Sequence, residues 1–135
     1  MLGERIGDSI GEMTGLRVLS PVEGHPRVEA SFRQSGTIFG VHVDDMGTYE
    51  SVLRPDGTFT GHGRGVSITE DGETLTWTGE GIGTSAGRPG AVAWRGAIYY
   101  RTTSQKLARL NGVAVLYEFD TDESNKVQAT LYEWK

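Results

Sequence analysis

Apolar and polar residues alternate along most of this chain, and that alternation is the pattern of a β-strand with one buried face. In the segment 28–33 (VEASFR), for example, every second residue is apolar. Clusters of turn-forming residues separate the alternating segments. Together these features predict eight strands, at residues 15–20, 28–43, 46–54, 58–69, 73–85, 91–103, 112–122 and 126–135.

The beginning of the chain is ambiguous. Ile6, Ile10 and Met13 have helix-like spacing, but the glycines at positions 3, 7 and 11 each weaken a helix by about 1 kcal/mol relative to alanine. We therefore interpret residues 1–13 as a loosely formed leading segment. The two prolines of Pro21–Pro26 indicate a loop after the first strand.

Two further local features are expected between the strands. The second strand should bend at residues 35–36 (Ser-Gly), and a turn should begin at residues 44–45 (Asp-Asp). The segment Ser104–Asn111 is the best helical candidate, because Ser104 can cap it, Leu107 and Leu110 share a face, and Asn-Gly ends it. We expect one or two turns of helix there.

The order of these elements favours an all-β fold. The strands follow one another in near-continuous hairpin order, and no strand–helix–strand alternation predicts a parallel sheet. A closed barrel leaves no exposed sheet edge, and the last strand, ending in Tyr132-Glu133-Trp134, could pair with the first. We therefore expect a single domain over residues 1–135: an eight-stranded, antiparallel, mostly meander β-barrel with one short helix before the last two strands.

Two Gly-x-Gly-x-Gly runs lie in neighbouring strands of this barrel, at positions 61–65 and 79–83. Pro55-Asp56-Gly57 and Glu70-Asp71-Gly72 look like three-residue hairpin loops, which fix the register. The predicted pairs are Tyr49 with Gly63, Leu53 with Phe59, and Trp77 with Gly65. Rings then cover the glycines, as in aromatic rescue. We assign to the barrel interior the apolar face formed by Tyr49, Leu53, Phe59, Leu75 and Trp77.

The opposite face of the same strands carries a polar cluster. The register places Glu50 and Glu80 on either side of His62, with Arg64 diagonal to both carboxylates. One interpretation is an acid–base site or a polar binding patch, because two glutamates favour a charged histidine. The other is a cross-strand charge ladder on the solvated outside. Several threonines share this face, so we expect the cluster to lie outside.

Composition narrows the classes of partner. The 135 residues include 18 acidic and 13 basic side chains, giving a net charge of −5. This balance favours a soluble protein and argues against nucleic acid or an anionic membrane surface as the main partner. The chain has no cysteine, which excludes disulfides and thiolate chemistry. Neither a signal peptide nor an apolar segment of membrane-spanning length is found, so we expect a cytoplasmic protein.

Motifs for metal or phosphate binding are weak. The histidines at positions 25, 42 and 62 lack the spacing of metal ligands. His42 with Asp44 and Asp45 could ligate a hard cation, but a lone histidine beside a turn is more often structural. The GHGRG segment is followed by strand residues rather than by the helix that a phosphate loop needs. We expect no metal and no cofactor.

Two glutamates near the ends of the last two strands are the remaining candidates for catalysis beside His62. Glu118 and Glu133 each lie among apolar residues (LYEF and LYEW). A carboxylate inside an apolar lumen would have its pKa raised and could act as a general acid or base. If the residues on either side of Glu118 face inward instead, its carboxylate is exposed to solvent. We favour this second arrangement for Glu118. For Glu133 the two arrangements are equally supported.

Aromatic residues are the candidate ligand-binding groups. Rings placed on the inward face could line a lumen, although eight strands leave room only for packed side chains or one small ligand. These residues are Tyr49, Phe59, Trp77, Trp94 and Tyr100.

The segment Trp77–Gly83 (WTGEGIG) resembles the Trp-x-Gly-x-Gly-x-Gly run of nitrobindin-like haem barrels. That family has the run near its N-terminus and a haem-binding histidine near its C-terminus, whereas no histidine follows His62 here. The whole chain resembles, in architecture, the eight-stranded barrels of the calycin and allene oxide cyclase type. The resemblance implies binding of a small, mostly apolar molecule in the barrel mouth. The alternatives are a cyclase or isomerase, or a packed barrel acting as an interaction module; a homo-oligomer is compatible with each.

Overall fold

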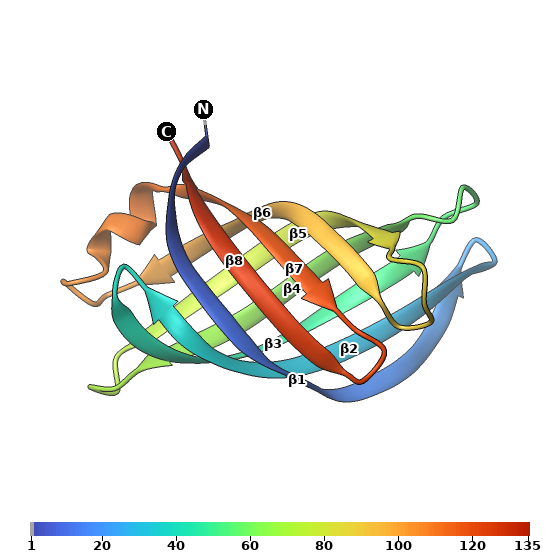
Figure 1. Ribbon diagram of the computed structural model, residues 1–135, viewed down its shortest axis with the longest axis horizontal. Helices are drawn as coiled ribbons and strands as arrows, with labels where there is room; N and C mark the ends of the chain where they lie inside the picture. Colours follow the sequence, from blue (N-terminus) through green and yellow to red (C-terminus); the bar gives the residue numbers. More distant parts are fainter. Residues whose placement is uncertain (1) are drawn as a thin grey trace.

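The computed structural model describes residues 2–135 as a closed β-barrel of eight strands. Each strand pairs antiparallel with the next, and β1 closes the barrel by pairing with β8 (Figure 1). The predicted fold class is therefore confirmed. The strands are β1 (Leu2–Val22), β2 (His25–Ile38), β3 (Val41–Leu53), β4 (Phe59–Thr69), β5 (Thr74–Ser85), β6 (Val92–Thr102), β7 (Ala114–Thr121) and β8 (Lys126–Trp134).

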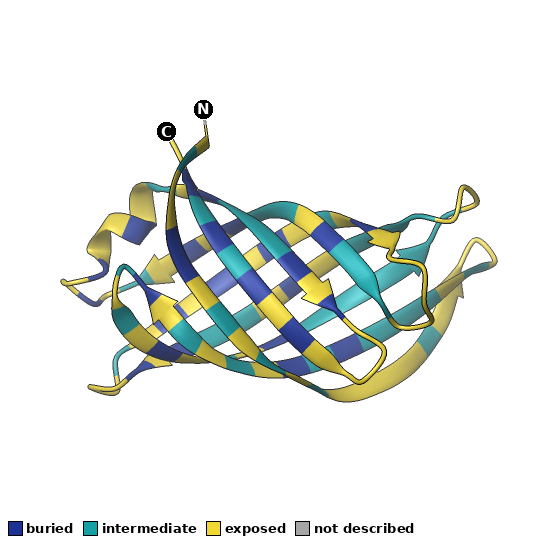
Figure 2. Cartoon of the chain, in the orientation of Figure 1, coloured by how far each residue is buried: buried dark blue, intermediate teal, exposed yellow. Residues whose placement is uncertain are grey.

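Alternation of the side chains separates the interior of the barrel from its outer surface (Figure 2). On β5, Leu75 and Trp77 are buried, whereas Thr76 and Thr78 are exposed. The same period of two runs through β8, where Val127, Ala129, Leu131 and Glu133 are buried. The inward residues of all eight strands thus form one core inside the barrel.

The register of the two glycine-rich strands agrees with the prediction. Tyr49 pairs with Gly63, Leu53 with Phe59, and Gly65 with Trp77. A Cβ atom at Gly65 would collide with the Trp77 indole, and one at Gly61 would lie 2.6 Å from Trp94 Cζ3. The glycines therefore provide the space into which the two large rings fold.

The predicted start of the chain is wrong. Residues 2–22 form one long strand, with a register shift between Met13 and Gly15. The glycines that argued against a helix have a role in this strand, because a Cβ at Gly7 or Gly11 would collide with a carbonyl oxygen of β2. The predicted loop Pro21–Pro26 shrinks to a turn at residues 23–24. Beyond Glu12, β1 has no register partner on β8.

The predicted boundary between the second and third strands is also wrong. The chain turns at Phe39-Gly40, both with positive φ (49° and 76°), rather than bending at residues 35–36. Two consecutive positive φ angles are the geometry of a tight two-residue hairpin. Asp44 and Asp45, predicted to begin a turn, lie within β3 instead. The side chain of Asp45 therefore points to the same face of β3 as every second residue of that strand.

The segment between β6 and β7 is less helical than predicted. It contains a short 3-10 helix, η1 (Ala108–Gly112), and Ser104 does not cap it. Leu107 and Leu110 are fully buried in the core, at the end of the barrel where η1 lies (Figure 1). Among residues 2–135 no helix is long and apolar enough to cross a membrane.

Candidate functional site

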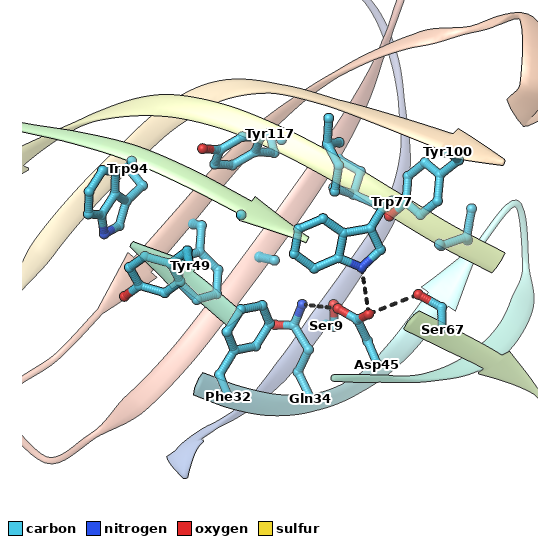
Figure 3. A pocket seen from close by; sticks show the side chains of 18 of the residues that line it. Ser9, Phe32, Gln34, Asp45, Tyr49, Ser67, Trp77, Trp94, Tyr100 and Tyr117 are labelled. Atoms are coloured by element: carbon cyan, nitrogen blue, oxygen red, sulfur yellow. Dashed lines mark hydrogen bonds between the residues drawn. The ribbon is translucent and has the colours of Figure 1, made fainter. Parts of the chain in front are cut away.

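A cavity of about 80 Å³ lies inside the barrel, and Figure 3 shows side chains that line it. Its wall is mostly apolar and is formed by residues of all eight strands, including Ser9 of β1. Of the five aromatic residues predicted to bind a ligand, four line this cavity: Tyr49, Trp77, Trp94 and Tyr100. Phe59 does not line it, but its ring packs 6.1 Å from that of Trp94, between centroids. The prediction that these residues bind a ligand stays a prediction.

The aromatic rings contact one another along the cavity. Phe32 lies at the centre, with ring centroids 4.9 Å from Phe119 and 6.2 Å from both Tyr49 and Trp77. Tyr49 continues the series to Trp94, at 5.5 Å and with an edge-on geometry. The Phe32–Trp77 pair is stacked and the other three are tilted or edge-on, and offset-stacked and edge-on pairs are the favoured arrangements of rings in a protein core. The rings therefore give the cavity a fixed shape.

One carboxyl group, that of Asp45, projects into this aromatic interior (Figure 3). Its Oδ1 accepts hydrogen bonds from Trp77 Nε1 at 2.8 Å and from Ser67 Oγ at 2.9 Å. Its Oδ2 accepts a third from Gln34 Nε2, at 3.0 Å. The donors come from three different strands, β2, β4 and β5. This convergence fixes the carboxyl group in the barrel.

The electrostatic environment of Asp45 is unusual for a carboxylate. Burial raises its pKa above the ordinary value, and the hydrogen bonds from Trp77, Gln34 and Ser67 lower it in part. No cationic side chain contributes to this balance within residues 2–135. Burial also raises the pKa of Tyr100, with a smaller contribution from the charge of Asp45, so this phenol stays neutral at pH 7.

A second polar group in the same place lacks a partner. Gln34 uses Nε2 to reach Asp45, while its Oε1 is buried and accepts no hydrogen bond within residues 2–135. An ionised carboxylate only accepts hydrogen bonds, which fixes the amide with its nitrogen toward Asp45. Such an orphaned acceptor is uncommon in folded proteins, because leaving it unpaired costs free energy.

Our sequence reasoning missed Asp45 as an interior group. The signal was present, because Val43, Asp45, Gly47 and Tyr49 occupy alternate positions on β3 and face the same way. Extending the alternation backward from Tyr49 would have placed Asp45 inside the barrel. The predicted turn at residues 44–45 concealed it. The cation site suggested by His42, Asp44 and Asp45 does not form, because successive side chains point to opposite faces of a strand; within residues 2–135 no cluster suits a metal ion.

The polar cluster predicted on the opposite face lies outside the barrel. His62 pairs in register with Glu50 and Glu80, as expected. Its Nδ1 lies 3.3 Å from a Glu80 oxygen, and both side chains are more than half exposed. Glu50 forms its ion pair with Arg27, at 3.5 Å, and Arg64 is exposed between Thr48 and Thr78. The arrangement is a solvated cross-strand ladder.

The two candidate glutamates lie on opposite sides of the barrel wall, as the alternation of side chains along β7 and β8 requires. Glu118 faces outward and lies 3.7 Å from Arg95. Glu133 faces inward, and its side chain is 10% exposed. Its two oxygens accept hydrogen bonds from Arg109 Nη2, at 2.8 and 2.6 Å, so η1 neutralises it. Glu133 is absent from the lining of the cavity that contains Asp45.

Comparisons with known proteins establish the fold. No protein-family model and no curated protein matches the sequence. A solved protein of unknown function from Clostridium acetobutylicum has a TM-score of 0.83 at 15% identity, covering 98% of this chain and 97% of its own. A β-barrel-like protein from Acinetobacter baumannii gives 0.83 at 12%, covering 100% and 96%. An enzyme from Penicillium herquei gives 0.68 at 17%, covering 96% and 92%. At these identities the likeness concerns the barrel alone.

Proposed function

We propose that this protein binds a small, mostly apolar molecule inside its barrel. The observation that carries the proposal is the cavity itself, which has an aromatic wall and a single fixed carboxyl group, Asp45. Ligand sites in proteins commonly combine a largely apolar lining with a few placed polar groups. The resemblance to calycin and allene oxide cyclase barrels points in the same direction, by analogy of fold. We retain a cytoplasmic location as part of the proposal.

The size of the cavity limits the ligand. A volume of about 80 Å³ is about half of the roughly 150 Å³ that holds benzene in an engineered apolar cavity. It is also well below the 300–1,000 Å³ or so of drug-sized sites. A molecule of about five non-hydrogen atoms is the appropriate scale unless the rings move. We therefore choose C4 compounds as probes.

The three tryptophans provide a test of occupancy. Trp77 and Trp94 line the cavity, whereas Trp134 is 55% exposed and serves as an internal reference. In ¹⁵N-correlated NMR, titration with C4 amines and alcohols should shift the indole signals of Trp77 and Trp94 saturably and leave Trp134 unchanged. Signals that do not move with any C4 probe, or that all move in parallel without saturation, would reject the proposal.

A matched pair of variants on β8 locates the site. Ala129 lines the cavity, so Ala129→Val should fill part of it and weaken the probe-induced shifts. Thr130, the next residue, lies on the outer face, opposite Glu118. The control Thr130→Val should leave the shifts unchanged. Equal effects of the two variants would place the binding elsewhere on the protein.

A specific observation also favours a second candidate, proton-transfer catalysis by Asp45. A carboxyl group whose pKa is raised by burial can act as a general acid toward a neutral substrate, as in a cyclase or isomerase. This candidate requires the protonated form of Asp45, whereas simple binding does not. Incubation with strained epoxides or small enones tests it: turnover by the wild type and none by Asp45→Asn supports catalysis, and product formation equal in both variants excludes it.

A further inference from the structure

Asp45 has hydrogen-bond donors but no counter-charge. All three donors that reach it, on Gln34, Ser67 and Trp77, are neutral groups. Within residues 2–135 no ion pair involves this carboxylate, although ten pairs of an arginine or lysine with a carboxylate occur elsewhere in the same residues. An ionised carboxylate in an apolar interior is costly unless a cation or several hydrogen bonds compensate it. The carboxylate is therefore compensated by hydrogen bonds from neutral donors alone.

The orphaned Gln34 Oε1 adds a second acceptor at the same place. Gln34 and Asp45 both line the cavity, and their side chains are joined by the 3.0 Å hydrogen bond. Oδ2 of Asp45 receives only this one hydrogen bond, so it retains the capacity to accept more. A group that satisfies both acceptors must therefore carry at least two hydrogen-bond donors. The single donor of an alcohol hydroxyl cannot satisfy both acceptors, whereas the three donors of an ammonium group can, and an ammonium group also brings the opposite charge.

The remaining wall of the cavity suits a positive charge. Phe32, Trp77 and Tyr100 line the cavity together with Asp45. The indole of Trp77 directs its Nε1–H edge at the carboxylate, and aromatic rings attract a cation that lies over their faces. An anionic ligand would meet the carboxylate directly and would be repelled. A neutral apolar ligand would fill the aromatic part of the cavity but leave both acceptors unsatisfied.

We propose that the ligand bound in this cavity is a small primary amine, whose ammonium group binds Asp45 and Gln34 and whose short apolar chain lies among the rings. This inference rests on the proposed function, because it names the chemical class of the molecule that the barrel binds. Asp45 supplies the charge, Gln34 supplies the second acceptor, and Trp77 and Ser67 hold the carboxylate in position.

Three probes of nearly equal size separate the classes of ligand. n-Butylammonium is the cation, 1-butanol the neutral analogue and butyrate the anion, and each is titrated into the whole protein by calorimetry and by indole NMR. We expect n-butylammonium to bind at least about tenfold more tightly than 1-butanol, because charge-assisted hydrogen bonds are about twice as strong as neutral ones. Butyrate should not bind.

Adjacent aspartates provide the variants. In Asp45→Asn the carboxylate is replaced by an amide, and we expect binding of n-butylammonium to fall at least about tenfold while binding of 1-butanol stays within about twofold. Asp44→Asn removes the same charge from the outer surface, where Asp44 accepts a hydrogen bond from Ser35 at 2.6 Å. This control should change neither affinity.

The outcomes are distinguishable. Preferential binding of n-butylammonium that is lost in Asp45→Asn and retained in Asp44→Asn supports the inference. Binding of 1-butanol as tightly as n-butylammonium, or equal loss in both aspartate variants, overturns it while leaving the barrel as a site for a small molecule. Binding of none of the three probes, with no shift of the Trp77 indole, overturns the inference together with the proposed function.

Discussion

In this barrel, glycines on one strand face large aromatic side chains from neighbouring strands. Gly65 faces the Trp77 indole, which in turn donates to Asp45, so a small residue on β4 fixes the ring that holds the carboxyl group. Gly47 belongs to the same set, because a Cβ there would lie 2.6 Å from the Trp77 ring and 2.7 Å from the Phe32 ring. The geometry of the site therefore depends on the glycines, which leave room for the rings, as much as on the rings themselves.

Substitution of Gly65 tests this dependence. Gly65→Ala should lower the free energy of unfolding by about 1–3 kcal/mol, because the added methyl group forces the Trp77 ring out of its position. Gly15→Ala is the control, since a Cβ at that site meets nothing within 4 Å. Denaturant unfolding of both variants provides the measurement. Equal stability of the two proteins would show that the ring does not pack on Gly65.

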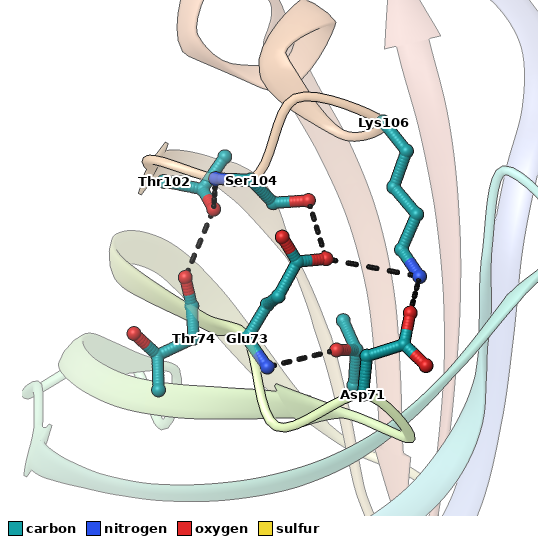
Figure 4. Close-up of polar contacts among 7 residues, drawn as sticks. Asp71, Glu73, Thr74, Thr102, Ser104 and Lys106 are labelled. Atoms are coloured by element: carbon teal, nitrogen blue, oxygen red, sulfur yellow. Dashed lines mark hydrogen bonds and ion pairs between the residues drawn. The ribbon is translucent and has the colours of Figure 1, made fainter.

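At the scale of elements, the segment from β6 to β7 acts as a strap across one end of the barrel. Lys106 bridges Asp71 and Glu73 on the β4–β5 turn, and Ser104 Oγ donates to Glu73 at 3.0 Å (Figure 4). Farther along, Arg109 binds Glu133. These contacts hold the buried leucines of the strap in the core, so we assign Glu133 a structural role.

Removal of Arg109 tests that assignment. The Arg109 guanidinium also lies 4.5 Å from the centre of the Phe39 ring. Arg109→Met should destabilise the protein by about 2–3 kcal/mol, because the buried Glu133 carboxylate loses its charged donor. The double variant with Glu133→Gln should recover most of that loss, and Lys106→Met, at an exposed ion pair, should cost less than about 1 kcal/mol. A Glu133→Gln variant that keeps full stability but loses an activity would contradict the structural role.

An element could be predicted well where residues close to it in the sequence determine its structure. Two Asp-Gly turns fix the register of residues 58–85, and the expected pairs of Tyr49, Gly65 and Trp77 form. The turn at Phe39-Gly40 was missed because a phenylalanine with positive φ is rare. That error moved Asp45 into a predicted turn, and with it the most informative residue of the cavity was lost.

Long-range contacts limited the prediction further. The pairing of β1 with β8 brings residues 2–12 into a strand that their own glycine-rich sequence only weakly favours. Likewise, nothing near Glu133 in the sequence indicates Arg109 as its partner, since 24 positions separate them. Closure of the barrel creates both contacts, so they are properties of the whole fold and not of either segment.

At the scale of the whole molecule, an uncompensated carboxylate inside the barrel couples stability to pH. The raised pKa of Asp45 means that the folded protein holds this proton more tightly than the unfolded chain. The wild type should therefore lose stability relative to Asp45→Asn as the pH rises from the ordinary value of 3.8 through the raised pKa, and the difference should persist at neutral pH.

Thermal unfolding of the two proteins across pH 3–8 or so measures this difference, because every other titrating group is common to both. Gln34 can rotate its amide to accept from the new asparagine, which preserves the hydrogen bonds. An Asp45→Asn variant less stable than the wild type at neutral pH would indicate that the charge is compensated within the protein. A saturating amine should reduce the difference, because it stabilises the wild type more than the variant, which binds it more weakly.

The most direct test of the account is the pKa of Asp45 itself, measured from the ¹³Cγ chemical shift against pH in the free protein and with n-butylammonium. Trp77, Ser67 and Gln34 donate to the carboxyl group, and the charge of Asp45 in turn contributes to the raised pKa of Tyr100. We expect a pKa above 3.8 in the free protein and a lower pKa when the amine is bound. A pKa at or below 3.8 in the free protein, unchanged by the amine, would contradict it.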